Sequence, residues 1–229
     1  MFFISEIFES IQGEGNYAGA RCLFIRFQHC NLSCKWCDTK FACGKNDKTE
    51  TFSAEELKAI IRNSTSHNVI FTGGEPALYR LDLLIADGKK FHVETNGTII
   101  PNQKLRCTLP NGSFFEREGM DENIIKHFNW VVSPKLSNSG EKINEESIRY
   151  FCIKNWGIFK FIIQNEEDIS EVNNFVEKFG IDKKNSYLAL EGVTQASQLR
   201  GALVDKIVEN GYNFSPRLQV LLWKSKRKK

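Results

Sequence analysis

Short apolar runs alternate with helix-like segments along most of this chain. The apolar runs lie at 22–27, 68–76, 91–98, 130–135, 158–164, 186–192 and 217–223. Segments with apolar residues at helical spacing lie at 52–64, 166–180 and 195–211. Strands that alternate with helices predict an α/β fold with a mostly parallel sheet covered by helices. With five to six such units, the chain has too few for a closed eight-unit barrel, so we expect an open, partial βα barrel.

Two of the helix predictions carry end signals. Ser53 and Glu56 have the spacing of a capping box, in which each residue satisfies a backbone donor at the start of the helix. Gly180 is expected to end the helix at 166–180. In the segment 195–211, we expect Leu199 to lie on a buried stripe.

Polar and glycine-containing motifs follow several of the predicted strands. These are TGGEP at 72–76, ETNGT at 94–98 and SPK at 133–135. In open parallel sheets, ligands bind at the carboxyl ends of the strands. The sequence therefore predicts one site that is built from segments far apart in the chain.

The chain shows no Pro/Gly/Ser-rich linker, so we expect one domain over residues 1–229. The segment 104–118 is an expected exception, a hairpin that turns at Asn111-Gly112 outside the main architecture.

The basic excess of the chain belongs to its last residues. The net charge is +3, and the tail 224–229 (KSKRKK) holds five of the 31 basic residues, against 28 acidic residues in the whole chain. Because the body has no basic cluster, we expect a solvated tail and no nucleic-acid partner. No run approaches the roughly 18 apolar residues of a membrane span, so no membrane partner is expected.

Three of the seven cysteines lie close together, at Cys30, Cys34 and Cys37. An odd cysteine count and an N-terminus without a basic flank argue against a secreted disulfide framework and for the cytoplasm. A zinc site would need a fourth protein ligand, for which Cys43 and His29 are candidates. An iron–sulfur cluster with three protein thiolates would leave one iron open to a small molecule.

The cysteine spacing, with Trp36 before the third cysteine, resembles the signature of radical S-adenosylmethionine enzymes, and GGEP at 73–76 resembles their glycine motif. The segment 6–41, followed in order by TGGEP, ETNGT and VSPK, resembles the 7-carboxy-7-deazaguanine synthase family. The resemblance implies the partial barrel of that superfamily. It also implies a 4Fe-4S cluster on Cys30, Cys34 and Cys37, whose open iron chelates S-adenosylmethionine and whose electron cleaves it to a 5′-deoxyadenosyl radical.

The implied activity is that of a lyase in queuosine and deazapurine biosynthesis. The enzyme would contract 6-carboxy-5,6,7,8-tetrahydropterin to 7-carboxy-7-deazaguanine with loss of ammonia, in the presence of Mg²⁺. The family also implies a reducing electron donor, such as flavodoxin or ferredoxin, and a homodimer.

The resemblance assigns S-adenosylmethionine to Gly74, Glu75, Ser133, Pro134 and Lys135. From the sequence alone, Glu75 could instead hold its turn, and Lys135 could be an exposed lysine. Thr39 is the expected Mg²⁺ ligand, since Mg²⁺ prefers oxygen; the alternative is a hydroxyl that caps its own loop. Neighbouring Asp38 is expected to be a loop carboxylate.

The implied substrate contacts form a second group. Gln12 offers a donor and an acceptor to the amide edge of the pterin, and Arg26 offers a planar fork to its carboxylate. An ion pair at the surface is the alternative for Arg26, and a tight turn is the alternative for the glycines of IQGEG. The complete set is Ile11, Gln12, Gly13, Glu14, Arg26 and Thr72.

One departure and two rival functions accompany this interpretation. Gln219 stands where several relatives have a histidine that reaches the substrate. The first rival is an enzyme that installs a glycyl radical on a partner protein, and the second is a zinc-binding module without catalytic activity.

Overall fold

A single large sheet organises this computed structural model, which describes residues 1–44, 49–224 and 226–228. The strands of the sheet are β1 (Phe2–Ile11), β2 (Arg21–Phe27), β3 (Glu50–Phe52), β4 (Asn68–Gly73), β5 (Lys90–Thr95), β8 (Asn129–Val132), β9 (Gly157–Ile163), β10 (Ser186–Leu190) and β11 (Asn213–Phe214). Among the described residues, these nine strands follow the order β11-β10-β9-β8-β5-β4-β2-β1-β3.

Parallel pairing joins β2, β4, β5, β8, β9, β10 and β11 in this order, whereas β1 is antiparallel to both β2 and β3. The edge strands β3 and β11 lie at opposite ends of this order and do not pair with each other within the described part of the chain. The sheet is therefore open, and the predicted α/β fold with a mostly parallel sheet is confirmed.

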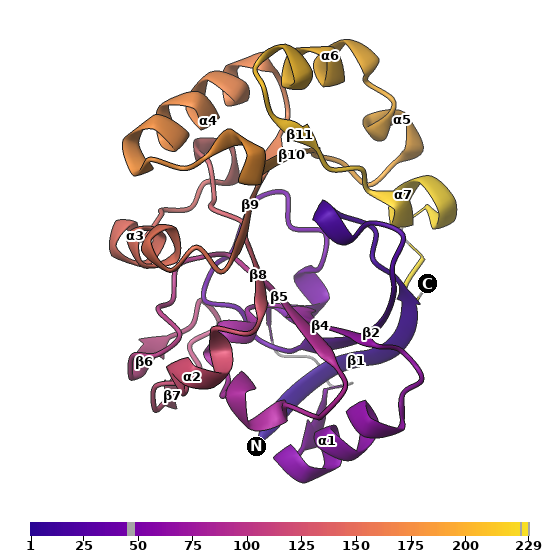
Figure 1. Ribbon diagram of the computed structural model, residues 1–229, viewed down its shortest axis with the longest axis vertical. Helices are drawn as coiled ribbons and strands as arrows, with labels where there is room; N and C mark the ends of the chain where they lie inside the picture. The colour runs from indigo at the N-terminus through magenta and orange to yellow at the C-terminus, as the bar shows by residue number, and fades with distance from the viewer. Residues whose placement is uncertain (45–48, 225, 229) are drawn as a thin grey trace.

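The helices of the described residues are α1 (Ala54–Asn63), α2 (Glu122–Ile125), α3 (Glu145–Lys154), α4 (Glu166–Phe179), α5 (Gln195–Gln198), α6 (Gly201–Glu209) and α7 (Leu218–Trp223). Helices α1, α3, α4 and α6 lie on the outer side of the curved sheet (Figure 1), whereas α7 contributes to the cavity described below. Short 3-10 turns occur at Gly15–Tyr17, Lys40–Ala42, Pro76–Leu78, Leu81–Leu84, Ser137–Ser139 and Lys183–Asn185. In Figure 1, α7 and the C-terminus lie at the right, near the far end of β1, whereas the N-terminus lies at the bottom of the view.

The two predicted helix signals are present. At the start of α1, the Ser53 hydroxyl accepts a hydrogen bond from the Glu56 backbone at 3.2 Å, and the Glu56 carboxylate accepts one from the Ser53 backbone at 2.7 Å. The C-cap of α4 is Gly180, in the left-handed conformation with a φ of 64°. Local sequence therefore fixes these two boundaries.

Alternating side chains on β2 divide the core from the opposite face of the sheet. Leu23, Ile25 and Phe27 are buried in the main core. Phe24 and Arg26 point the other way, because successive strand residues face opposite sides, and they line a cavity described below.

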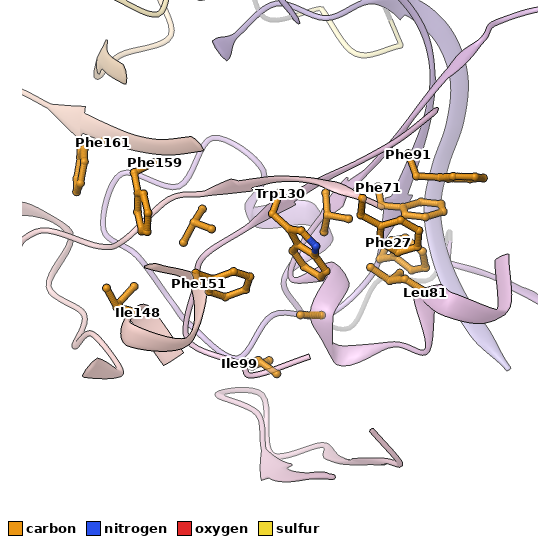
Figure 2. Packing of buried hydrophobic residues seen from close by; sticks show 14 of the residues in the cluster. Phe27, Phe71, Leu81, Phe91, Ile99, Trp130, Ile148, Phe151, Phe159 and Phe161 are labelled. Carbon is orange, nitrogen blue, oxygen red and sulfur yellow. The ribbon is translucent and has the colours of Figure 1, made fainter. Parts of the chain in front are cut away.

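Aromatic rings fill the main core beneath the parallel strands. Figure 2 shows Phe27, Phe71, Trp130 and Phe151 in one row along the sheet. The ring centroids of Phe27 and Phe71 are 5.8 Å apart, and those of Trp130 and Phe151 are 5.4 Å apart. Trp130 is fully buried, and its indole N–H donates to the Ile125 carbonyl at 3.0 Å.

The strand expected at 217–223 is wrong, because this segment forms helix α7. The sheet ends at the two-residue strand β11, and Pro216, which has no N–H for a further ladder, follows shortly after. Val220 is buried whereas Leu222 is 57% exposed. A short apolar run does not distinguish a strand from a one-sided helix.

The single helix expected at 195–211 is also wrong, since it divides into α5 and α6. Leu199 lies at the break and is 72% exposed instead of buried. The Arg200 guanidinium donates to the carbonyls of Gln164 and Glu191 and so holds the chain at this break.

The sequence interpretation also missed β1, β3, β11, α2 and α3, so the sheet has more strands than the five to six expected.

Strands β6 (Leu105–Thr108) and β7 (Phe114–Arg117) pair antiparallel in a separate two-stranded sheet within the segment 104–118. Their turn contains Gly112, whose N–H donates to the Leu109 carbonyl at 2.9 Å.

Within the ranges that the structure describes, no helix has both the length and the apolar character needed to cross a bilayer.

Candidate active site

The carboxyl ends of the parallel strands open into one cavity of about 330 Å³. Register explains why, because Phe27 pairs with Gly73 where β2 and β4 end, and Thr95 pairs with Val132 where β5 and β8 end. The segments that follow these residues carry the cysteines, GGEP, NGT and SPK. The cavity therefore lies where parallel sheets bind their ligands.

Most of the side chains predicted from the sequence line this cavity. They are Ile11, Gln12, Gly13, Glu14, Arg26, Cys30, Cys34, Cys37, Thr39, Thr72, Gly74, Ser133 and Lys135. Glu75 and Pro134 are not part of the lining.

The cysteine loop is held by the segment that follows β8. The Lys35 N–H donates to the Ser139 carbonyl at 3.0 Å, and the Trp36 indole donates to Asn138 at 2.9 Å. Cys30 and Cys34 are buried, and burial raises the pKa of the Cys34 thiol to about 11. The hydrogen bond from Cys43 lowers the pKa of Cys37 to about 6, which favours the thiolate form that binds iron.

The two candidate fourth ligands differ in position. The Cys43 sulfur lies 3.8 Å from that of Cys37 and also lines the cavity. His29 packs edge-on against Phe3 and Phe115, at 5.4 Å from each ring, and does not line the cavity. In the described part of the chain, no three His, Cys, Asp or Glu side chains are grouped to hold a single metal ion. A thiol set that faces a cavity of this size fits an iron–sulfur cluster, which proteins hold through cysteine thiolates.

The GGEP turn packs directly on the cysteine loop. The Gly74 N–H donates to the Phe27 carbonyl at 3.0 Å, and the Glu75 N–H donates to the His29 carbonyl at 2.8 Å. A Cβ at position 74 would lie 1.9 Å from the His29 carbonyl oxygen, so only glycine allows this close approach.

Glu75 is fully buried and serves the turn. Its carboxylate accepts hydrogen bonds from the Ala77 backbone at 2.8 Å, the Thr95 hydroxyl at 2.7 Å and the Asn96 backbone at 2.7 Å. Burial raises the pKa of this carboxyl, although these donors oppose the shift. Of the two sequence interpretations, the structure supports the one in which Glu75 holds the turn.

Ser133 and Lys135 form a polar edge of the cavity. The Ser133 N–H donates to the Thr95 carbonyl at 2.8 Å, which extends the pairing of β5 and β8. The Lys135 ammonium donates to the Ser133 hydroxyl at 3.0 Å and lies 5.5 Å from the centre of the Trp36 ring. Lys135 is half-buried, and desolvation lowers its pKa, so it is not the exposed lysine of the alternative interpretation.

Thr39 presents its hydroxyl between the cysteine loop and the glycine turn. The hydroxyl lies 3.4 Å from the Gly73 carbonyl and 3.7 Å from the Cys37 sulfur, and it makes no side-chain cap at its own turn. The neighbouring Asp38 also lines the cavity and pairs with Arg217. Thr39 thus has an oxygen at the cavity wall, as a hard metal ion would require.

A buried charge network also lines the cavity. Lys160, whose side chain is 8% exposed, is 2.9 Å from Glu14 and 2.7 Å from Glu94. Gln12 donates to the other oxygen of Glu94 at 2.9 Å. Burial alone would raise the pKa of Glu14, but Lys160 and Arg217 lower it well below its usual range. Glu14 is therefore held as an anion at the cavity wall.

Gln219 reaches the same network from α7. Its amide donates to Glu14 at 2.6 Å, and the Leu218 N–H donates to the Gly13 carbonyl at 3.0 Å. A Cβ at position 13 would lie 1.8 Å from the Gln219 side-chain oxygen, so an alanine there would displace the end of this side chain. Gln219 therefore lies on the cavity wall beside Glu14.

Residues 226–228 of the basic tail are exposed, as expected, and they also line the cavity. The Arg227 guanidinium donates to Glu6 at 2.7 Å and lies 3.9 Å from the centre of the Phe41 ring. Glu6 also accepts a hydrogen bond from Arg26 at 3.1 Å. Arg26 therefore pairs with an acid, but from a position on the cavity wall.

Sequence reasoning missed several polar residues of the lining, among them Glu94, Asn96, Lys160 and Arg217. One signal was available, since Lys160 interrupts the apolar strand IFKFIIQ at 158–164 and a lysine in a buried strand requires a partner. The partners themselves lie in other strands and loops, so their identity depends on the fold.

Comparison with known proteins relates this chain to one family. The sequence model of the Radical SAM superfamily matches residues 24–106, which include the cysteine loop and GGEP. A 7-carboxy-7-deazaguanine synthase from Pyrobaculum aerophilum is 30% identical over 99% of this chain and 96% of its own length. The enzyme of that name from Thermoplasma acidophilum is 32% identical over 92% of this chain and 90% of its own length.

Among solved structures, the crystal structure of QueE from Escherichia coli shares the fold. It superposes with a TM-score of 0.68 over 93% of this chain and 92% of its own, at 23% identity. The identity and coverage of the sequence relatives show that this chain belongs to the 7-carboxy-7-deazaguanine synthase family.

Proposed function

We propose that this chain is a radical S-adenosylmethionine lyase that converts 6-carboxy-5,6,7,8-tetrahydropterin to 7-carboxy-7-deazaguanine with loss of ammonia. The observation that carries the proposal is one cavity lined by three cysteines, the glycine turn and the buried network of Glu14. The names and coverage of the relatives support the same reaction over almost the whole chain.

We assign the 4Fe-4S cluster to Cys30, Cys34 and Cys37. When bound, the cluster supplies the electron that cleaves S-adenosylmethionine. Asn96 supports Cys30, since its amide lies 3.9 Å from that sulfur. The Lys35 backbone N–H, which donates to Ser139, and the Trp36 indole, which donates to Asn138, fix the loop that carries the thiols.

S-adenosylmethionine is assigned to the wall between the glycine turn and the SPK segment. Gly74 offers backbone without a side chain, and Ser133 offers a hydroxyl near the Lys135 ammonium. Glu75 and Pro134 would act indirectly, by shaping the turns that carry these groups. The lowered pKa of Lys135 reflects desolvation, which an incoming carboxylate would offset.

The pterin is assigned to the wall formed by Ile11, Gln12, Gly13 and Glu14. A pterin presents N–H donors along one ring edge, and the anionic Glu14 is an acceptor suited to them. Lys160 keeps that acceptor ionised and fixed, so little reorganisation is needed when the ring binds. Thr72 pairs with Arg26 across β4 and β2, which brings both side chains to the same face.

Mg²⁺ is assigned to the Thr39 hydroxyl together with the substrate carboxylate. Mg²⁺ keeps several waters and uses few protein ligands, so a single threonine oxygen suits it. We further propose a cytoplasmic homodimer of single-domain chains that is reduced by a flavodoxin or ferredoxin, on the basis of the family alone.

Anaerobic reconstitution with iron and sulfide, followed by S-adenosylmethionine, reductant and the carboxylated pterin, tests the proposal. We expect 7-carboxy-7-deazaguanine, with more product when Mg²⁺ is present. Formation of 5′-deoxyadenosine without the deazaguanine product would reject the substrate assignment. Activity only with a partner polypeptide would favour the glycyl-radical rival, and a colourless zinc protein would favour the zinc module.

A further inference from the structure

Glu6 is a buried carboxylate that two arginines share. Its side chain is 1% exposed, and its two oxygens accept from different partners. One oxygen accepts from Arg26 on β2 at 3.1 Å, and the other accepts from Arg227 of the C-terminal segment at 2.7 Å. Both arginines also lie over the ring of Phe41, at 5.8 Å and 3.9 Å from its centre.

The charge of this group depends on Arg227. Glu6 and Arg26 alone carry no net charge, so an anionic ligand would gain little from Arg26 while Glu6 competes for it. With Arg227 bound to Glu6, the three side chains carry one net positive charge at the cavity wall. A guanidinium that pairs with a buried carboxylate is also screened less by salt than an exposed pair.

We infer that Arg227 is a positioning residue for substrate binding, because it neutralises Glu6 and leaves Arg26 available to the substrate carboxylate. This inference rests on the proposed function and deepens it, since it gives the C-terminal segment a part in recognition of the anionic group. Arg227 itself acts through Glu6 and not on the reacting atoms. Phe41 in the turn after the cysteine loop fixes the guanidinium plane from one side.

The alternative is a purely structural role, in which Arg227 only attaches the chain end to β1. The two roles differ in what a variant does to ligands of different charge. A structural role weakens the binding of any pterin, whereas charge neutralisation matters only for a pterin that carries a carboxylate.

The test measures equilibrium binding in the reconstituted holoenzyme with S-adenosylmethionine, without reductant, so that no turnover is needed. Two probes are compared, the carboxylated tetrahydropterin and tetrahydropterin without the carboxylate. For Arg227→Gln, we expect the dissociation constant of the carboxylated probe to rise about tenfold, as for the loss of one charge-assisted contact. The dissociation constant of the uncharged probe should change less than about twofold.

The variant Glu6→Gln supplies the decisive comparison. Once Glu6 is neutral, Arg26 has no competing anion, so Arg227→Gln should have little further effect in the Glu6→Gln background. Arg227→Lys should recover most of the affinity, because the charge is kept. Lys206→Gln on α6 removes a similar exposed charge outside the cavity and serves as the matched control.

Each outcome separates this inference from the proposed function. Equal effects of Arg227→Gln on both probes, or an undiminished effect in the Glu6→Gln background, would overturn the role of Arg227. If the unaltered enzyme fails to bind or convert the carboxylated pterin, the proposed function fails instead.

Discussion

Lys160 on β9 donates to Glu14 in the loop after β1 at 2.9 Å. This hydrogen bond joins two segments of the cavity wall that are far apart in the sequence. The same ammonium donates to Glu94 on β5 at 2.7 Å, so one buried cation holds two carboxylates. The ion pair between Lys160 and Glu14 thereby fixes the loop that we assign to the pterin.

Replacement of Lys160 by methionine should destabilise the protein by about 3 kcal/mol, since it leaves buried carboxylates with too few partners. The free energy of unfolding in urea, measured on cluster-free protein under reducing conditions, checks this value. Lys178→Met, which removes an exposed pair with Glu145, should change it by less than about 1 kcal/mol. Equal losses in the two variants would contradict a structural role for the network.

The cluster assignment predicts a difference between cysteines that lie within the same cavity. Alanine at Cys30, Cys34 or Cys37 should abolish retention of iron and sulfide after anaerobic reconstitution, because a cluster needs its thiolates. Cys43→Ala should retain both, although its sulfur lies 3.8 Å from that of Cys37. Iron and sulfide contents and the visible spectrum report the result. Loss of the cluster in Cys43→Ala would make Cys43 a fourth ligand and close the open iron.

Two glycine-to-alanine variants should have opposite effects on stability. At Gly74, a Cβ would meet the His29 carbonyl at 1.9 Å, so Gly74→Ala should cost about 2 kcal/mol and weaken the binding of S-adenosylmethionine. At Gly201, the first residue of α6, a Cβ would meet nothing within 4 Å, so Gly201→Ala should stabilise by about 0.5 kcal/mol. Thermal unfolding measures the stability of both variants, and isothermal titration calorimetry measures the affinity of Gly74→Ala for S-adenosylmethionine. A stable Gly74→Ala protein with unchanged affinity would refute the close contact.

His92 predicts acid sensitivity of the fold between pH 6.5 and pH 4. Burial lowers its pKa from 6.5 to about 4, so below pH 6.5 the unfolded chain takes up a proton that the folded chain does not. Acidification from pH 6.5 to 5 should therefore cost about 2 kcal/mol of stability, and none of this loss occurs above pH 7. Urea unfolding of the cluster-free protein at each pH gives the slope of the free energy of unfolding against pH. The His92→Gln protein should show a shallower slope, and identical slopes would assign the acid sensitivity to other groups.

The parallel core was predictable because its signals are local. The apolar runs at 22–27, 68–76, 91–98, 130–135, 158–164 and 186–192 correspond to strands, and the capping box of Ser53 marks the start of a helix. Strand β1 was missed because its pattern, with Glu6 inside an apolar segment, has meaning only when Arg26 and Arg227 lie beside it.

The same distinction applies to the site. Cys30, Cys34, Cys37 and Gly74 belong to compact motifs, so their convergence could be expected, while their roles stay predictions. The partners of Glu14 are separated from it by much of the chain, and no spacing in the sequence connects them. The segment 217–223 shows the limit of such reasoning. Its apolar residues fit a strand as well as a helix, and only the structure shows that the sheet already ends at β11.

Gln219 and Glu14, which form a hydrogen bond, are 205 positions apart. During synthesis, the loop at Glu14 leaves the ribosome before α7 does. The wall that we assign to the pterin therefore cannot be complete before α7 has emerged, and closing so long a loop belongs to the slow, late events of folding.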